Sequence, residues 1–232
     1  YAAGPSPLGA SAAPVTASAF PITVGAGGTG GTYSPAARGT SGGVSTFSTI
    51  TSAGGGSGGG NAPGAGATYY PGGAGGSGGG AKANASFTGV AGAGNTPPSS
   101  PPQGNTAGNS NAPGSPENNA GGAGAGGASN PAPTDTPNNG GYGGVGLASS
   151  ITGSPVGRGG GGSGNGDTSP YGNANPTGYP FGGGKSNSPT TPGAAGTVNT
   201  GGGGGAGPVC APNSTNAGTG GSGIVIIRYR FQ

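Results

Sequence analysis

The sequence predicts a mostly irregular protein with minor β-structure and almost no α-helix, built as a bundle of extended polyglycine-II-type helices. Three observations lead to this fold class. Gly and Pro make up 66 and 24 of the 232 residues, and only 4% of the residues are charged. The aliphatic and aromatic residues are too few for a conventional side-chain core. Short glycine-dominated tracts alternate with separators rich in Pro, Asn, Ser and Thr, interrupted by a few β-type segments.

The same composition is also typical of a disordered or silk-like linker, which remains an alternative. Disordered chains usually combine low hydrophobicity with high net charge, whereas this chain carries a net charge of only +3. Charge repulsion therefore does not hold the chain apart. A glycine-rich backbone offers many N–H and C=O groups that can bond to one another. We therefore expect order that rests on backbone hydrogen bonds.

The glycine tracts are the main element of the predicted fold. They break the strict third-residue glycine period of collagen, and they recur at irregular separations, so neither collagen nor a regular solenoid is indicated. The tracts are 25–31, 54–60, 72–80, 121–127, 140–146, 157–166, 201–207 and 218–223.

A polyglycine-II helix is extended and has no internal hydrogen bonds, so its backbone groups point outward to neighbouring helices. Each bond contributes only about 1 kcal/mol, so many bonds are needed to offset the ordering of glycine. A helix inside such a bundle has almost no room for side chains, whereas a rim helix can carry them on its outward side. We expect 54–60 (GGGSGGG) and 201–207 (GGGGGAG) inside, and 121–127 (GGAGAGG) and 140–146 (GGYGGVG) at the rim.

Three short β-type segments precede the C-terminus. Ala19–Val24 and Thr46–Thr51 are rich in β-branched and aromatic residues, and each leads toward a glycine tract. Pro21 should delay the start of the first strand or confine it to a sheet edge. Ser149–Thr152 is a weaker third segment.

The strongest predicted strand runs from Ile224 to Phe231, directly after the last glycine tract. One of its two faces is wholly apolar and aromatic, so we expect that face to be buried. Paired with the early strands, it would act as a clasp that ties the two ends of the bundle together. The predicted clasp residues are Ile22, Val24, Phe47, Ile50, Val225, Ile227, Tyr229 and Phe231. The expected organisation is an N-terminal lead-in over 1–18, which we interpret as the remainder of a truncated upstream region, and a glycine-rich domain over 19–232 that ends in this strand.

Five aromatic residues lie in separators that contain Pro and Asn and do not fit a strand pattern. Exposed aromatic side chains often anchor binding surfaces, so these residues are candidate contacts for a receptor or partner. The simpler interpretation, which we prefer, is that they cover the ends or sides of the glycine bundle. The residues are Tyr69, Tyr70, Tyr171, Tyr179 and Phe181.

The chain lacks most residues that catalysis and metal binding require. It has no His, one Cys (Cys210) and three separated acidic residues, Glu117, Asp135 and Asp167. We therefore expect no enzyme activity and no catalytic, cofactor-binding or metal site. The dispersed net charge does not indicate nucleic-acid binding, and the longest apolar run is too short to cross a membrane.

Several segments together resemble the glycine-rich domain of bacteriophage tail-fibre and other virion proteins. They are AFPITVGAGGTGG, VSTFSTITSAGGGSGGG, LASSITGSPVGRGGGGSG, GTVNTGGGGGAG and, most specifically, GGSGIVIIRY. The likeness runs from about Ala19 to the C-terminus. Between Asn105 and Asn139 the chain departs from it, because Ala, Asn, Pro, Ser and Thr replace many glycines.

The resemblance implies a non-enzymatic structural or adhesive protein of the virion, on a tail fibre or the particle surface. Its rigid glycine-rich body would present loops to a host-surface receptor, such as a glycan or an outer-membrane protein. Other expected partners are further copies of the chain or other virion proteins. The alternatives are a self-assembling extracellular filament or coat subunit and an ice-binding or silk-like protein.

Overall fold

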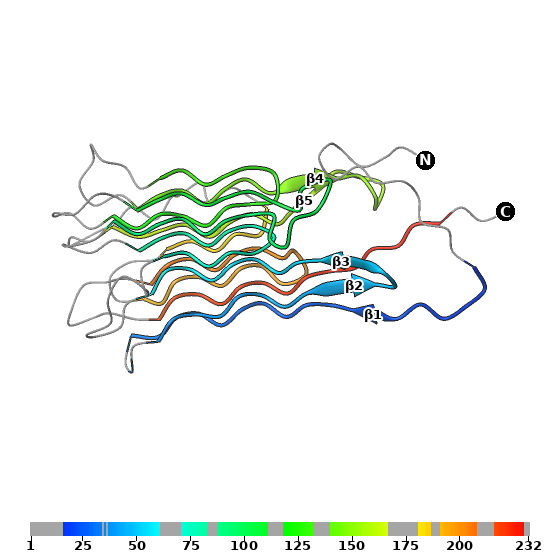
Figure 1. Cartoon of the computed structure of the whole chain (residues 1–232), viewed down its shortest axis with the longest axis horizontal. Coiled ribbons are helices and arrows are strands. Elements are labelled where there is room, and N and C mark those ends of the chain that lie inside the picture. The colour runs from blue at the N-terminus through cyan, green and yellow to red at the C-terminus, as the bar shows by residue number, and fades with distance from the viewer. Residues whose placement is uncertain are drawn as a thin grey trace.

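Extended glycine-rich tracts run back and forth along one axis and form a bundle, with short strands at one end (Figure 1). This computed structural model describes residues 16–33, 35, 37–60, 71–82, 88–110, 118–131, 140–166, 181–186, 191–207 and 216–229. These residues include no α-helix and five strands of two or three residues each. The predicted fold class is thus confirmed.

The larger sheet joins the first β segment to the second. Strands β1 (Ile22–Thr23), β2 (Ser45–Phe47) and β3 (Ile50–Ser52) form an antiparallel sheet in the order β1-β2-β3. Ile22 pairs with Phe47, which in turn pairs with Ile50. The late start of β1 follows from Pro21, which has no N–H to donate to a sheet.

Two of the segments predicted as single strands contain a chain reversal in the structure. The segment expected as one strand, Thr46–Thr51, reverses at Ser48, whose φ of 54° is left-handed. A two-residue connection of this kind closes a hairpin. In the second sheet, β4 (Leu147–Ser149) pairs with β5 (Val156–Arg158), so only the first residue of Ser149–Thr152 belongs to a strand.

The predicted C-terminal strand is wrong for the residues that the structure describes. Residues 224–229 belong to neither sheet, and the face expected to be buried exposes 50% of Ile227 and 74% of Tyr229. In the bundle of glycine tracts, only some positions of each tract have room for a side chain. A segment with large side chains at consecutive positions, such as 224–229, therefore cannot pack as a further tract. Phe231 lies outside the described residues.

The other predicted clasp residues are also largely exposed. Ile22, Val24 and Ile50 each expose about half of their surface, with values of 50%, 49% and 55%. Phe47 is the exception, because its ring stacks on Phe20 with centroids 5.6 Å apart. The early strands therefore form a sheet, but they are not clasped by the C-terminal segment.

Hydrogen bonds between tracts recur every third residue, as polyglycine-II helices require. In the first pair of tracts, Thr40 N donates to Thr29 O at 3.2 Å, and Gly43 N donates to Ala26 O at 2.8 Å. Three residues separate the bonds on each tract. The side chains follow the same period, because Ala26, Thr29 and Thr32 are all exposed while glycines stand between them.

The tract 158–166 is among the most highly connected in this network. Its bonds reach four other tracts: 119–125, 141–144, 181–184 and 200–206. A Cβ added to Gly161 would overlap the carbonyl of Gly122, and one added to Gly162 would overlap the carbonyl of Gly204. Close approach of neighbouring backbones therefore explains why these positions are glycine.

The predicted inner and rim positions are only partly correct. The tract 201–207 lies inside, and Tyr142 of 140–146 is 38% exposed at the rim. In 121–127, which we expected at the rim, Ala123 is only 7% exposed. In 54–60, which we expected inside, Gly55 and Gly58 are exposed. Glycine content alone therefore does not rank the tracts by depth.

Candidate functional site

The two ends of the bundle differ, because the tract residues that flank most of the separators lie at one end. Six of them are flanked on both sides by tract residues at the end opposite the sheets (Figure 1). Bonds such as Gly59 N to Gly80 O and Ala217 N to Gly31 O hold those flanking residues at one level. The six separators are 61–70, 83–87, 111–117, 132–139, 187–190 and 208–215.

Most of the predicted contact residues lie outside the described part of the chain. Tyr69 and Tyr70 belong to the separator 61–70, whose flanking residues are at this end. Tyr171 and Tyr179 belong to 167–180. The described residue before this segment, Gly166, lies at this end, and the one after it, Phe181, lies beside the second sheet.

Phe181 is described, and it lies beside the second sheet. Its ring occupies the space that a Cβ on Gly157 would need, and its Cβ lies close to Gly146. The side chain is half-buried. Phe181 therefore covers the side of the bundle next to β5, in line with the simpler interpretation of the loop aromatics.

The opposite end of the bundle carries the sheets and exposed apolar side chains. Ile22, Ile50, Ile224, Ile227 and Tyr229 are all exposed there. The described residues nearest the two chain termini, 16–21 and 224–229, also leave the bundle at this end (Figure 1). Apolar side chains exposed at one end are typical of an interaction surface.

The polar chemistry of the described residues is largely structural. The Arg38 guanidinium donates to the Gly58 carbonyl at 3.2 Å and to the Pro71 carbonyl at 2.9 Å, so it bridges the two flanks of the separator 61–70. Among the residues that the structure describes, no three His, Cys, Asp or Glu side chains lie close enough to hold a metal ion. The same residues contain no helix that is long and apolar enough to cross a bilayer.

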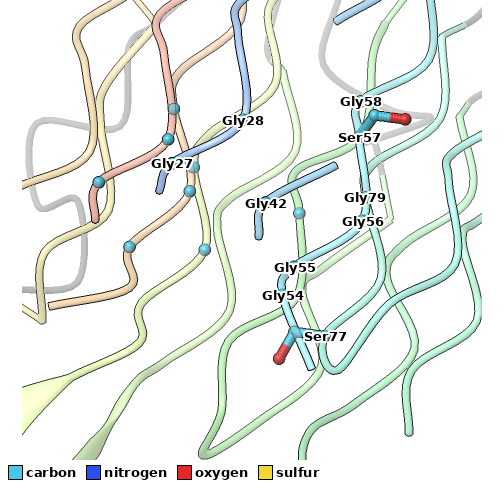
Figure 2. A pocket seen from close by; sticks show the side chains of 18 of the residues that line it. Gly27, Gly28, Gly42, Gly54, Gly55, Gly56, Ser57, Gly58, Ser77 and Gly79 are labelled. Atoms are coloured by element: carbon cyan, nitrogen blue, oxygen red, sulfur yellow. The ribbon is translucent and has the colours of Figure 1, made fainter. Parts of the chain in front are cut away.

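The bundle also encloses a channel, which the sequence interpretation missed. Its volume is about 630 Å³, and glycines form most of its wall. Figure 2 shows Gly42 between the tract of Gly27 and Gly28 and the tract of Gly54–Gly58. No single sequence motif marks a channel of this kind, because its wall is mostly the backbone of glycines from separate tracts.

The fold defines a class of protein in which hydrogen bonds between glycine-rich tracts replace a side-chain core. The chain belongs to the family of the glycine-rich domain, whose family model matches residues 3–230. No curated protein and no solved structure matches the chain.

Proposed function

We propose that this protein is a non-enzymatic structural or adhesive component of a virion, of the tail-fibre type. Support comes from the difference between the two ends of the bundle. The chain leaves the bundle at the end with the sheets and exposed apolar side chains. Six separators have their flanking residues at the other end. A protein attached at the first end would present the separators outward.

The bundle is suited to hold such separators in place. Each tract is bonded to its neighbours along its length, so an attached loop has a fixed base. Variable binding residues on loops of a rigid scaffold are a common way to build recognition surfaces. The proposed occupants of this surface are host glycans or outer-membrane proteins, and the proposed location is the particle surface.

The exposed apolar side chains favour contacts with other subunits at the sheet end. These contacts would join copies of this chain or attach it to another virion protein. A self-assembling filament remains the second candidate for the same reason. Sedimentation of the purified chain distinguishes the two, since a monomer at high concentration contradicts the filament.

The adhesive function is tested by binding of the purified, labelled chain to host cells. The double variant Tyr69→Ala, Tyr70→Ala should lose binding while its amide exchange stays like that of the parent chain. Tyr229→Ala is the matched control, because it removes an exposed tyrosine at the opposite end and should bind normally. Unchanged binding of the double variant contradicts these receptor contacts.

A further inference from the structure

The channel is enclosed by a closed ring of tracts in which each tract is hydrogen-bonded to the next. Representative bonds include Gly42 N to Gly55 O, Gly122 N to Gly162 O and Gly220 N to Gly28 O. No backbone hydrogen bond between the described residues crosses the channel. In order around it, the ring consists of tracts 25–32, 37–44, 53–60, 76–82, 118–125, 158–166, 200–207 and 216–223.

The size of this ring indicates how much is missing from its centre. A helix with three residues per turn directs its backbone groups so that up to six neighbours can surround it. In such a hexagonal array, one vacant position is enclosed by six helices, and two adjacent vacant positions are enclosed by eight. The ring has eight members. The channel therefore has the width of two neighbouring helices, and none of the described tracts occupies either position.

Several glycines in the wall are not explained by the fold itself. An added Cβ would come no closer than 3.5 Å to another atom at Gly42, 3.8 Å at Gly55 and 3.7 Å at Gly122. None of the three has a positive φ. A side chain would thus fit at each position, in contrast to Gly161 and Gly162, where it would overlap a neighbouring backbone.

These three glycines lie at one level of the channel. Gly42 N donates to Gly55 O. The residue after Gly55, Gly56, donates to Ser77 O on the next tract of the ring. Ala123, the residue after Gly122, donates to Gly78 O, which is adjacent to Ser77. The Cβ position of Gly122 is flanked by tracts 76–82 and 158–166, the two ring neighbours of its own tract. Side chains at this level would enter the channel, so their absence keeps it open.

Part of the wall also has free bonding capacity. Gly27, Gly30 and Gly204 line the channel, and their backbones make no hydrogen bond to any other described residue. The three residues are partly exposed, so water can bond to their backbone groups, and a partner that enters the channel has to replace those bonds with its own. That partner must itself carry few side chains, because segments that fill the channel would have the backbones of the surrounding tracts on almost every side.

We propose that the channel is a binding site for two adjacent, extended, glycine-rich segments of a partner polypeptide, joined as a hairpin. The partner is recognised through its backbone and through its lack of side chains. The two inserted segments would occupy the two helix positions at the centre of the ring and so complete the lattice. This site is separate from the receptor-binding separators, so the two proposals stand or fall independently.

The probe is a synthetic peptide with two Gly-Gly-Ser tracts, each as long as 54–60, joined by an Asn-Pro-Asp-Gly turn. Titrated into the full chain, it should shift the amide resonances of Gly42, Gly55 and Gly122 and slow their hydrogen exchange. A peptide with Ala-Ala-Ser tracts should produce neither effect. Equal binding of the two peptides overturns recognition through the absence of side chains.

Two variants block the channel from different sides. Gly122→Leu and Gly42→Leu should each weaken binding of the glycine peptide at least tenfold. Ala93→Leu is the control, because Ala93 is exposed on a tract outside the ring, and it should bind like the parent chain. Native amide exchange outside the channel shows that each variant is folded.

The proposal is overturned if the peptide does not bind, or if it binds equally to both blocked variants. It is also overturned if the full chain fills the channel by self-association and the peptide does not compete, because the occupant is then a second copy.

Discussion

The last described segment of the chain, 216–229, has a polar, glycine-rich first part and an apolar second part. Hydrophobicity predicts that the second part is the better packed of the two, and the structure shows the reverse. Residues 216–223 are Asn, Ala, Gly, Thr and Ser, yet they bond to tracts 25–31, 193–196 and 201–205 on three sides. Residues 224–229 hold the longest apolar run, yet they join no sheet and Tyr229 is 74% exposed. In this fold, close backbone packing organises the chain, and large side chains are confined to the ends and the rim.

Deletion of the two halves should have unequal effects, and this is the largest expected difference. Removal of 216–232 eliminates eight backbone hydrogen bonds to the rest of the bundle. At about 1 kcal/mol each, they amount to roughly the stability of a small domain, so this chain should unfold. Removal of 224–232 alone should leave the Gly43 and Gly203 amides protected from exchange.

The second-largest loss of stability is expected when a single methyl group is added inside the lattice. Gly162→Ala places a Cβ against the Gly204 carbonyl, so the backbones must separate. We expect a loss of about 3 kcal/mol in the free energy of unfolding, measured with urea. Gly122→Ala is the matched control, because the nearest atom to its added Cβ, the Gly78 carbonyl oxygen, is 3.7 Å away. Equal losses in both variants would contradict the role of close packing.

Removal of a half-buried ring tests how much side-chain burial contributes. Phe181→Ala exposes the backbone near Gly157 and Gly146 and should lower the free energy of unfolding by about 1.5 kcal/mol. This is less than the expected effect of one methyl group at Gly162. If the phenylalanine variant is the less stable of the two, side-chain burial contributes more than the comparison implies.

The smallest effect is expected in the apolar half itself. Ile227 is 50% exposed and lies in neither sheet, so Ile227→Ser should change the free energy of unfolding by no more than about 0.5 kcal/mol. Thermal unfolding followed by circular dichroism measures the change. A large loss would show that the C-terminal segment is buried in solution, as the sequence pattern alone suggests.

The glycine bundle could be predicted because its cause lies in local composition. Tracts with almost no side chains have no other way to satisfy their backbone groups than to bond to one another. The three-residue spacing of Ala26, Thr29 and Thr32 also indicates which side of their tract faces solvent, although the prediction from sequence did not use it. This spacing is the signal that could have separated outward rows from inward ones.

The remaining errors arise from properties that depend on neighbouring tracts. Ala120 and Ala123 are only 6% and 7% exposed, and the sequence AGGAGAGG of 120–127 does not reveal which of its alanines are buried. The turn at Ser48 divides a run of β-forming residues that looks continuous. The apolar pattern after Gly223 fits a two-residue strand period, but the adjoining lattice has a period of three. The eight-membered ring likewise depends on pairings between distant tracts.

The ring has a consequence for how the protein is made. Its first tract contains Gly28 and its last contains Gly220, and these two residues are hydrogen-bonded neighbours. Synthesis proceeds from the N-terminus, so the seven earlier tracts emerge from the ribosome before the one that closes the ring. The growing chain therefore cannot close the ring until its last glycines appear, and a translation product that stops before them lacks the tract that closes it.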